Sequence, residues 1–249
     1  MIHHFTYGPV TPVLAYAMSV FGSFLGLRAA LRSRYYRDRR RAAWLTAAAV
    51  AIGGAGIWAM HFIAMLGFSI TDRNIRYDVP LTVASLLIAI VVVACGLFIV
   101  GYHGVGVLQL GSAGLITGCG VAAMHYLGMA AMHVGEHVSY DRTLVVLSVV
   151  IAVVAATAAL WAALSAENAW FTVGAAGVMG AAISSMHYTG MAAMNLHHVS
   201  DAVNPMEGAA QINVIIPLMM GIIVVATVIS GALVLSPDLK ELREEAPAH

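Results

Sequence analysis

Long apolar segments alternate with short polar segments along the chain, and this pattern predicts seven membrane-spanning helices. The apolar segments cover approximately residues 9–31, 42–68, 80–102, 109–133, 144–165, 169–195 and 213–235. Each is close to the roughly 20 residues that an α-helix needs to cross a bilayer. We therefore expect an all-α integral membrane protein with three parts: an extracytoplasmic N-terminus (1–8), a seven-span membrane domain (9–235) and a cytoplasmic tail (236–249).

The composition agrees with this assignment. Hydrophobic residues make up 61% of the chain and charged residues only 10%, whereas soluble domains contain about 25% charged residues. The two cysteines, Cys95 and Cys119, lie in separate apolar segments without metal-binding spacing, so we expect them to be small buried hydrophobic residues. Membrane lipid is the expected surrounding, and nothing in the chain indicates binding to nucleic acid.

The basic residues predict the orientation. Seven of the twelve lysine and arginine residues fall in one short stretch, from the end of the first span to the start of the second, namely Arg28, Arg32, Arg34, Arg37, Arg39, Arg40 and Arg41. Short connections rich in lysine and arginine stay in the cytoplasm. This places the N-terminus outside and, after seven crossings, the C-terminus in the cytoplasm.

One short sequence occurs three times, near the predicted outer ends of the second, fourth and sixth spans. It reads A-M-H-F-I-A-M from Ala59, A-M-H-Y-L-G-M from Ala123 and S-M-H-Y-T-G-M from Ser185. The three histidines, 64 and 62 residues apart, are His61, His125 and His187. Because alternate spans run in the same direction, the chain contains three parallel two-helix repeats plus one extra helix. We expect the three histidines to face one another at one depth.

The side chains of this motif suit a soft or borderline metal ion. A histidine in an apolar span is costly unless it has a partner, imidazole binds copper, zinc, iron and nickel, and thioether sulfur selects Cu(I). No carboxylate repeats with the motif, which argues against a hard, oxygen-ligated ion. Residues i and i+4 share a helix face, so the expected ligands are His61, His125, His187, Met65, Met129 and Met191.

Several further residues are secondary candidates for metal binding. They are Met60, Met124, Met186, Met132, Met194, His133 and His3. The first three lie about 100° from the histidines around the helix, whereas the next three are expected on the histidine face, one turn beyond the i+4 methionines. With a free terminal amine, His3 could complete a square-planar nitrogen set. Small residues allow close helix packing, and we assign this role to Gly56, Gly120, Gly128 and Gly190.

The motifs resemble the MHYT family of bacterial membrane sensor domains. The likeness is carried by Met124-His125-Tyr126 and by Met186-His187-Tyr188-Thr189, while the first copy reads Met60-His61-Phe62-Ile63. The resemblance implies an inner-membrane protein with a copper site near the outer face that senses oxygen, carbon monoxide or nitric oxide. Such domains are often joined to domains that make or degrade cyclic di-GMP. Only 14 residues follow Leu235, so we expect either a stand-alone copy without an output domain or a piece of a longer protein.

The leading hypothesis is therefore a non-enzymatic membrane sensor that binds copper, responds to a diatomic gas or to copper itself, and signals to a cytoplasmic partner. A copper transporter or membrane metal chaperone is the first alternative, because parallel repeats also occur in transporters. A haem or electron-transfer protein is the second. Zinc and haem are the less favoured cofactors.

Overall fold

The computed structural model of the chain describes residues 2–3, 6–70, 75–135, 137–165, 168–197 and 208–237, without the side chains of residues 2, 3, 70, 137 and 197. Within these residues, seven helical segments are long and apolar enough to cross a membrane. Six of them are single helices: α1 (Val10–Ser33), α4 (Val79–His103), α5 (Val107–Ala130), α6 (Arg142–Ser165), α7 (Ala169–Ala192) and α8 (Gln211–Leu235). The remaining span, the second in the chain, is continuous and consists of α2 (Arg39–Ala49), the π-helix η1 (Val50–Ala59) and α3 (Met60–Leu66). The predicted seven-span helical fold is confirmed.

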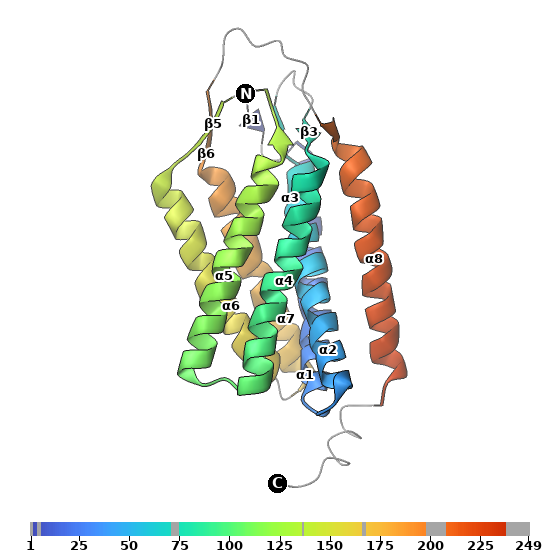
Figure 1. The fold of residues 1–249 in the computed structure, drawn as a ribbon. Coiled ribbons are helices and arrows are strands. Elements are labelled where there is room, and N and C mark those ends of the chain that lie inside the picture. Colours follow the sequence, from blue (N-terminus) through green and yellow to red (C-terminus); the bar gives the residue numbers. More distant parts are fainter. Residues whose placement is uncertain are drawn as a thin grey trace.

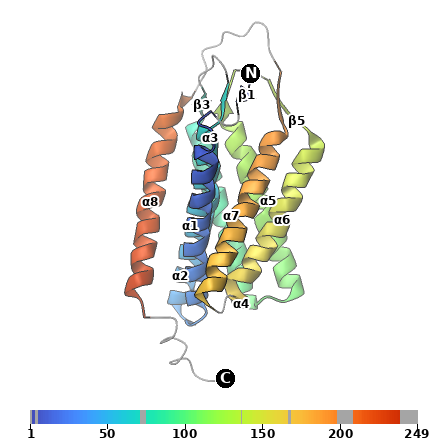
Figure 2. The same ribbon diagram turned by 180° about the vertical axis from the view of Figure 1, so that it is seen from behind.

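Six of the spans form a closed ring, and the seventh packs outside it. Each span of the ring contacts the next in chain order, and α1 closes the ring by packing against α7. The three motif helices, α3, α5 and α7, also meet across the interior: α7 contacts both α3 and α5, and α5 contacts η1. The last helix, α8, lies against α1 and η1 (Figures 1 and 2). The bundle thus contains three parallel helix pairs plus one extra helix, as expected.

Polar side chains fix where several spans begin. The carboxylates of Asp78 and Asp141 accept hydrogen bonds from the backbone N–H groups of Leu81 and Leu144 and cap α4 and α6. The Asn168 side chain caps α7 in the same way. These caps satisfy backbone donors that a helix cannot pair internally.

Within the described residues, seven short strands gather at one end of the bundle, which we call the strand end. They are β1 (Ile2–His3), β2 (Ser69–Ile70), β3 (Arg76–Tyr77), β4 (Met132–His133), β5 (His137–Tyr140), β6 (Met194–His197) and β7 (Ala209–Ala210). They form the antiparallel pairs β1–β2 and β5–β6 and the three-stranded sheet β4-β3-β7. The α1–α2 connection lies at the opposite end, which we call the arginine end (Figure 1). The sequence pattern did not predict these strands.

The strands shorten the motif helices relative to the prediction. The spans expected to end at residues 68, 133 and 195 end at Leu66, Ala130 and Ala192, because the chain then enters β2, β4 and β6.

Glycines allow the first motif helix to pack directly against α1. A Cβ atom at Gly22 would collide with the backbone of Gly56 on η1. At Gly53 a Cβ atom would lie 2.6 Å from the carbonyl oxygen of Ala89 on α4. The π-helical stretch from Val50 to Ala59 contains three glycines, so its backbone lies close to both neighbouring helices.

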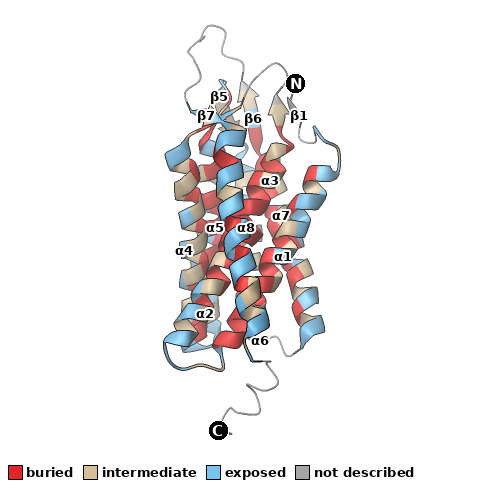
Figure 3. Ribbon diagram, turned by 90° about the vertical axis from the view of Figure 1, so that its right-hand side faces the viewer, coloured by how far each residue is buried: buried red, intermediate tan, exposed pale blue. Residues whose placement is uncertain are grey.

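Burial divides the bundle into a buried interior and an exposed apolar surface (Figure 3). The surface carries large apolar side chains such as Val91, Val154 and Val228, as expected where a helix faces lipid. Both cysteines lie on this surface. Our expectation that they are buried was wrong, because Cys95 and Cys119 occupy outward-facing positions on apolar helices, where lipid accepts a thiol as readily as the interior does.

Candidate metal centre

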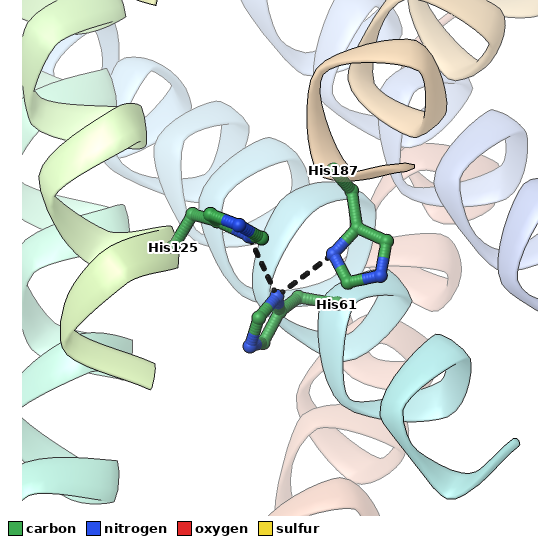
Figure 4. A group of neighbouring side chains, drawn as sticks. All are labelled: His61, His125 and His187. Atoms are coloured by element: carbon green, nitrogen blue, oxygen red, sulfur yellow. Dashed lines mark hydrogen bonds between the residues drawn. The ribbon is translucent and has the colours of Figure 1, made fainter. Parts of the chain in front are cut away.

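The structure brings His61, His125 and His187 together in the interior, from three different repeats. The residues are 1%, 0% and 1% exposed. The Nδ1 atom of His61 lies 3.0 Å from Nδ1 of His187 and 3.2 Å from Nδ1 of His125. Potential ligand atoms of all three residues lie within 4.8 Å of one another. Figure 4 shows the rings pointing toward a common centre from α3, α5 and α7.

This geometry fits a metal ion. Nitrogen ligands lie about 2.0–2.1 Å from a bound zinc ion, which places three of them roughly 3.3–3.6 Å apart. The two Nδ1 separations that involve His61 are only a few tenths of an ångström shorter, and ligand atoms of all three histidines lie within 4.8 Å of one another. A neutral imidazole nitrogen is either a donor or an acceptor, so mutual hydrogen bonds cannot satisfy three convergent nitrogens, whereas one cation can accept all three lone pairs. The three buried histidines could therefore hold a metal ion.

The opposite edges of two rings rest against glycines of the next repeat. A Cβ atom at Gly128 would lie 2.7 Å from Nε2 of His61, and one at Gly190 would collide with Nε2 of His125. These two glycines therefore make room for the imidazole rings, a more specific role than the general helix packing we expected. Gly120 packs against Val92 on α4, which matches the expectation for helix packing.

Both Nε2 atoms at these glycines are buried, and neither has a hydrogen-bond partner among the described residues. The hydrogen-bonding nitrogens of His61 and His125 are thus the ones that face the centre of the triad.

The methionines of the motif are all buried. Met65, Met129 and Met191 are 1%, 3% and 4% exposed and lie one helical turn from the histidines, toward the strand end. Met60, Met124 and Met186 are equally buried, at 1%, 1% and 2% exposed. Burial alone does not distinguish a ligand from a packing residue, so the role of the methionines as ligands stays a prediction.

The expected helical stripe beyond the i+4 methionines is wrong. Because α5 ends at Ala130 and α7 at Ala192, Met132 lies in β4 and Met194 in β6. His133 also lies in β4, where its backbone pairs with Arg76 on β3. The 3.6-residue helical period therefore does not relate these residues to the histidines. His3 pairs with Ser69 through the backbone, and its side chain lies outside the described residues.

Two serines anchor the motif helices to the helices that follow them. The Tyr126 hydroxyl is 2.7 Å from Ser148 Oγ on α6. In the first repeat Phe62 replaces this tyrosine, and Trp58, one turn earlier, donates from Nε1 to Ser85 Oγ on α4 at 2.9 Å. Ser85 and Ser148 are 63 residues apart, so the repeat spacing could have revealed them. The Thr189 hydroxyl donates to the carbonyl oxygen of Ser185 on its own helix.

Known proteins share these repeats. A family described as "Bacterial signalling protein N terminal repeat", MHYT, matches residues 54–113, 118–176 and 180–243. The chain belongs to the MHYT family. The matched units start within η1, α5 and α7, and each includes the span that follows. The family repeat therefore pairs each motif helix with the next span, whereas the helix pairs of the ring join it to the preceding span.

The chain resembles the amino-acid sequences of larger signalling proteins. It is 37% identical over 193 residues to the bifunctional diguanylate cyclase/cyclic di-GMP phosphodiesterase MucR of Pseudomonas aeruginosa, covering 76% of this chain and 28% of MucR. It is 35% identical over 203 residues to the cyclic di-GMP phosphodiesterase NbdA of the same organism, covering 79% and 25%. Signaling protein YkoW of Bacillus subtilis is 27% identical over 201 residues, covering 78% and 25%. The chain thus spans about a quarter of the length of these relatives. No solved structure matches it significantly.

These findings establish a multi-pass membrane protein built from the MHYT signalling repeat, with a buried histidine triad that could hold a metal ion.

Proposed function

We propose that this chain is a non-enzymatic sensor domain of the bacterial inner membrane, in which His61, His125 and His187 hold one copper ion near the outer face. The convergence of three Nδ1 atoms in a buried site, with Nδ1 separations of 3.0 and 3.2 Å, carries this proposal. The arginine-rich α1–α2 connection supports an orientation with the strand end outside.

Copper is favoured over zinc and haem by the donor set. Imidazole suits several metals, but the buried thioethers of Met65, Met129 and Met191 one turn away favour Cu(I). Haem iron has two axial positions, so haem bound between helices does not account for three equivalent histidines. Bound copper would offer an open coordination position to oxygen, carbon monoxide or nitric oxide, or copper itself would be the signal.

The chain's own residues would pass the signal on. Each histidine belongs to a different repeat, so a change in their spacing moves three motif helices relative to one another. A ligand shifts such an equilibrium only if it binds the two arrangements with different affinities. We propose that the resulting change reaches a cytoplasmic signalling partner through the arginine end. The relatives named for cyclic di-GMP turnover support output of that kind.

The test is elemental analysis of the chain purified in lipid nanodiscs. We expect one copper ion per chain in the wild type and none in the triple variant His61→Ala, His125→Ala, His187→Ala. His103→Ala is the matched control, because His103 is exposed at the opposite end of the bundle. Carbon monoxide added to the Cu(I)-loaded protein should give an infrared C–O stretch that the triple variant lacks. Stoichiometric zinc, or copper retained by the triple variant, would overturn the proposal.

A further inference from the structure

An apolar cavity lies directly beneath the histidine triad, on its arginine-end side. Three residues of its lining, Ile57, Val121 and Ile183, each precede the histidine of their own span by four positions. Positions i and i+4 share one face of a helix, so the three side chains form the layer next to the histidines. Met186, the neighbour of His187, also lines the cavity. The cavity therefore ends at the layer of side chains directly below the triad.

The lining chemistry excludes water and ions. Apart from Thr117, every lining residue is apolar, and the Thr117 hydroxyl already donates to the carbonyl oxygen of Val92 at 3.2 Å. A buried water molecule needs two to four polar partners, and apolar cavities of this kind stay dry. The same lining offers a metal ion no imidazole and no charged ligand, and only the thioethers of Met179 and Met186.

The size of the cavity restricts its occupant to a very small molecule. Its volume is about 50 Å³. One water-sized molecule requires about 10–15 Å³ on such a measure, whereas sites for drug-sized ligands cover about 300–1,000 Å³. A quinone or a lipid chain is too large, and a molecule of two heavy atoms fits.

The cavity approaches the lipid-facing surface between α6 and α7. Its wall there consists of the alanines Ala155 and Ala159 on α6 and Ala182 on α7, all only half-buried. Small side chains leave this wall thin. Apolar gases dissolve in the hydrocarbon core of the bilayer, so a molecule entering here would reach the triad without crossing a polar layer.

We infer that this cavity binds a diatomic apolar gas and admits it from the bilayer, between α6 and α7, to the underside of the histidine triad. The inference rests on the proposed function in one respect, that the gas binds a copper ion at the triad. Gas binding in the cavity itself requires no metal, so gas binding in the cavity and copper binding at the triad can be tested separately.

The first experiment uses oxygen as a paramagnetic probe of the metal-free protein in nanodiscs. With the methionine methyl groups labelled with carbon-13, oxygen pressure should increase relaxation several-fold more at Met179 and Met186, which line the cavity, than at Met60 and Met124, which are equally buried but do not line it. The variant Ala159→Leu, Ala182→Leu should remove this difference. The matched control is Ala158→Leu, Ala181→Leu, which adds the same volume at the adjacent exposed positions. Equal relaxation at all four methionines in the wild type would overturn gas binding in the cavity.

The second experiment tests the route. Carbon monoxide association with the Cu(I)-loaded protein, followed by stopped flow, should slow at least several-fold in Ala159→Leu, Ala182→Leu at unchanged copper content. The control variant should keep the wild-type rate. An unchanged rate in the filled variant would overturn the route. A wild type that binds no copper would instead refute the proposed function, while the oxygen experiment would still decide whether the cavity binds gas.

Discussion

Nε2 of His61 lies so close to Gly128 that a Cβ atom at residue 128 would be 2.7 Å away from it. Gly190 stands in the same relation to His125. Each glycine lies three residues after the histidine of its own repeat and contacts the histidine of the preceding repeat. The first repeat has Ala64 at the equivalent position. The position of each of these two rings is therefore set by a neighbouring repeat.

We predict that Gly128→Ala and Gly190→Ala lower copper affinity about tenfold or more, because functional groups must stay within about 0.5 Å of their productive positions. Alanine favours a helix over glycine by about 1 kcal/mol, so the loss would not reflect a weaker helix. Competition titration with a chelator measures the effect. Gly174→Ala is the control, since nothing lies within 4 Å of a Cβ atom there. Unchanged affinity in both variants would show that the rings tolerate displacement.

The methionines one turn beyond the histidines can be separated from packing residues by oxidation state. Met129→Leu with Met191→Leu conserves volume and apolarity, so folding should change little. Thioether ligands favour Cu(I), so this variant should lose Cu(I) affinity and keep Cu(II) affinity, whereas His125→Ala should lose both. Titrations against chelators specific for each oxidation state decide this. Met179→Leu, at a buried methionine outside the three motifs, serves as the control, and an unchanged Cu(I) affinity in the double variant would remove Met129 and Met191 from the ligand set.

Arginines in the α1–α2 connection and in the adjoining turns of α1 and α2 bind the ends of three other helices. Arg32 is 2% exposed and donates from Nη1 to the carbonyl oxygen of Leu233 in the last turn of α8 at 3.0 Å. Arg34 donates to Leu164 in the last turn of α6 at 2.6 Å, and Arg41 donates to Gly101 in the last turn of α4. Such contacts pair carbonyl groups that a helix end leaves open and match its dipole.

We predict that Arg32→Gln loosens the end of α8. A hydrogen bond to a charged group contributes about 1.5–3 kcal/mol, so amide exchange in the last turn of α8 should accelerate by roughly one to two orders of magnitude. Hydrogen exchange measured by mass spectrometry reports it. Arg37→Gln is the control at an exposed position of the same connection. Identical exchange in both variants would contradict the assigned role of Arg32.

Orientation in the membrane is testable by labelling. After replacing Cys95 and Cys119 with alanine, cysteines introduced at the exposed positions Arg37 and Asn195 lie at opposite ends of the bundle. An impermeant thiol reagent added to intact cells should modify residue 195 and leave residue 37 unmodified. The reverse pattern would invert the topology.

Alkaline pH should destabilise the strand end through Tyr77, which lies in β3 outside the spans and is fully buried. Burial raises the pKa of its hydroxyl above the ordinary value. Above about pH 10 the unfolded chain therefore loses a proton that the folded chain retains, and the free energy of unfolding falls as pH rises. The thermal midpoint of Tyr77→Phe should fall less between about pH 8 and pH 11 than that of the wild type. An equal fall of the thermal midpoint in the wild type and in Tyr77→Phe would show that ionisation of Tyr77 does not contribute to the loss of stability.

The arrangement of the triad was predictable because a repeat of 64 and 62 residues returns each histidine to the same depth on parallel helices. The positions of Met132, Met194 and His133 were not predictable from the sequence. Apolar residues continue past the ends of α5 and α7, and the point at which a strand replaces the helix depends on pairing between segments that are distant in the sequence. Packing between neighbouring helices also determines the hydrogen bonds of Trp58 to Ser85 and of Arg32 to α8. The 63-residue spacing of Ser85 and Ser148 signals the first of these contacts, whereas no pattern in the sequence signals the second.

The contact between α1 and α7 means that the ring has no first or last repeat. In an open array of stacked repeats, the terminal units contact one neighbour and need polar outer faces. Here every repeat has two neighbours, so loss of one repeat would break two interfaces and leave two apolar faces without a partner. The six-helix ring should therefore assemble as one cooperative unit, and a working fragment shorter than three repeats is not expected to exist.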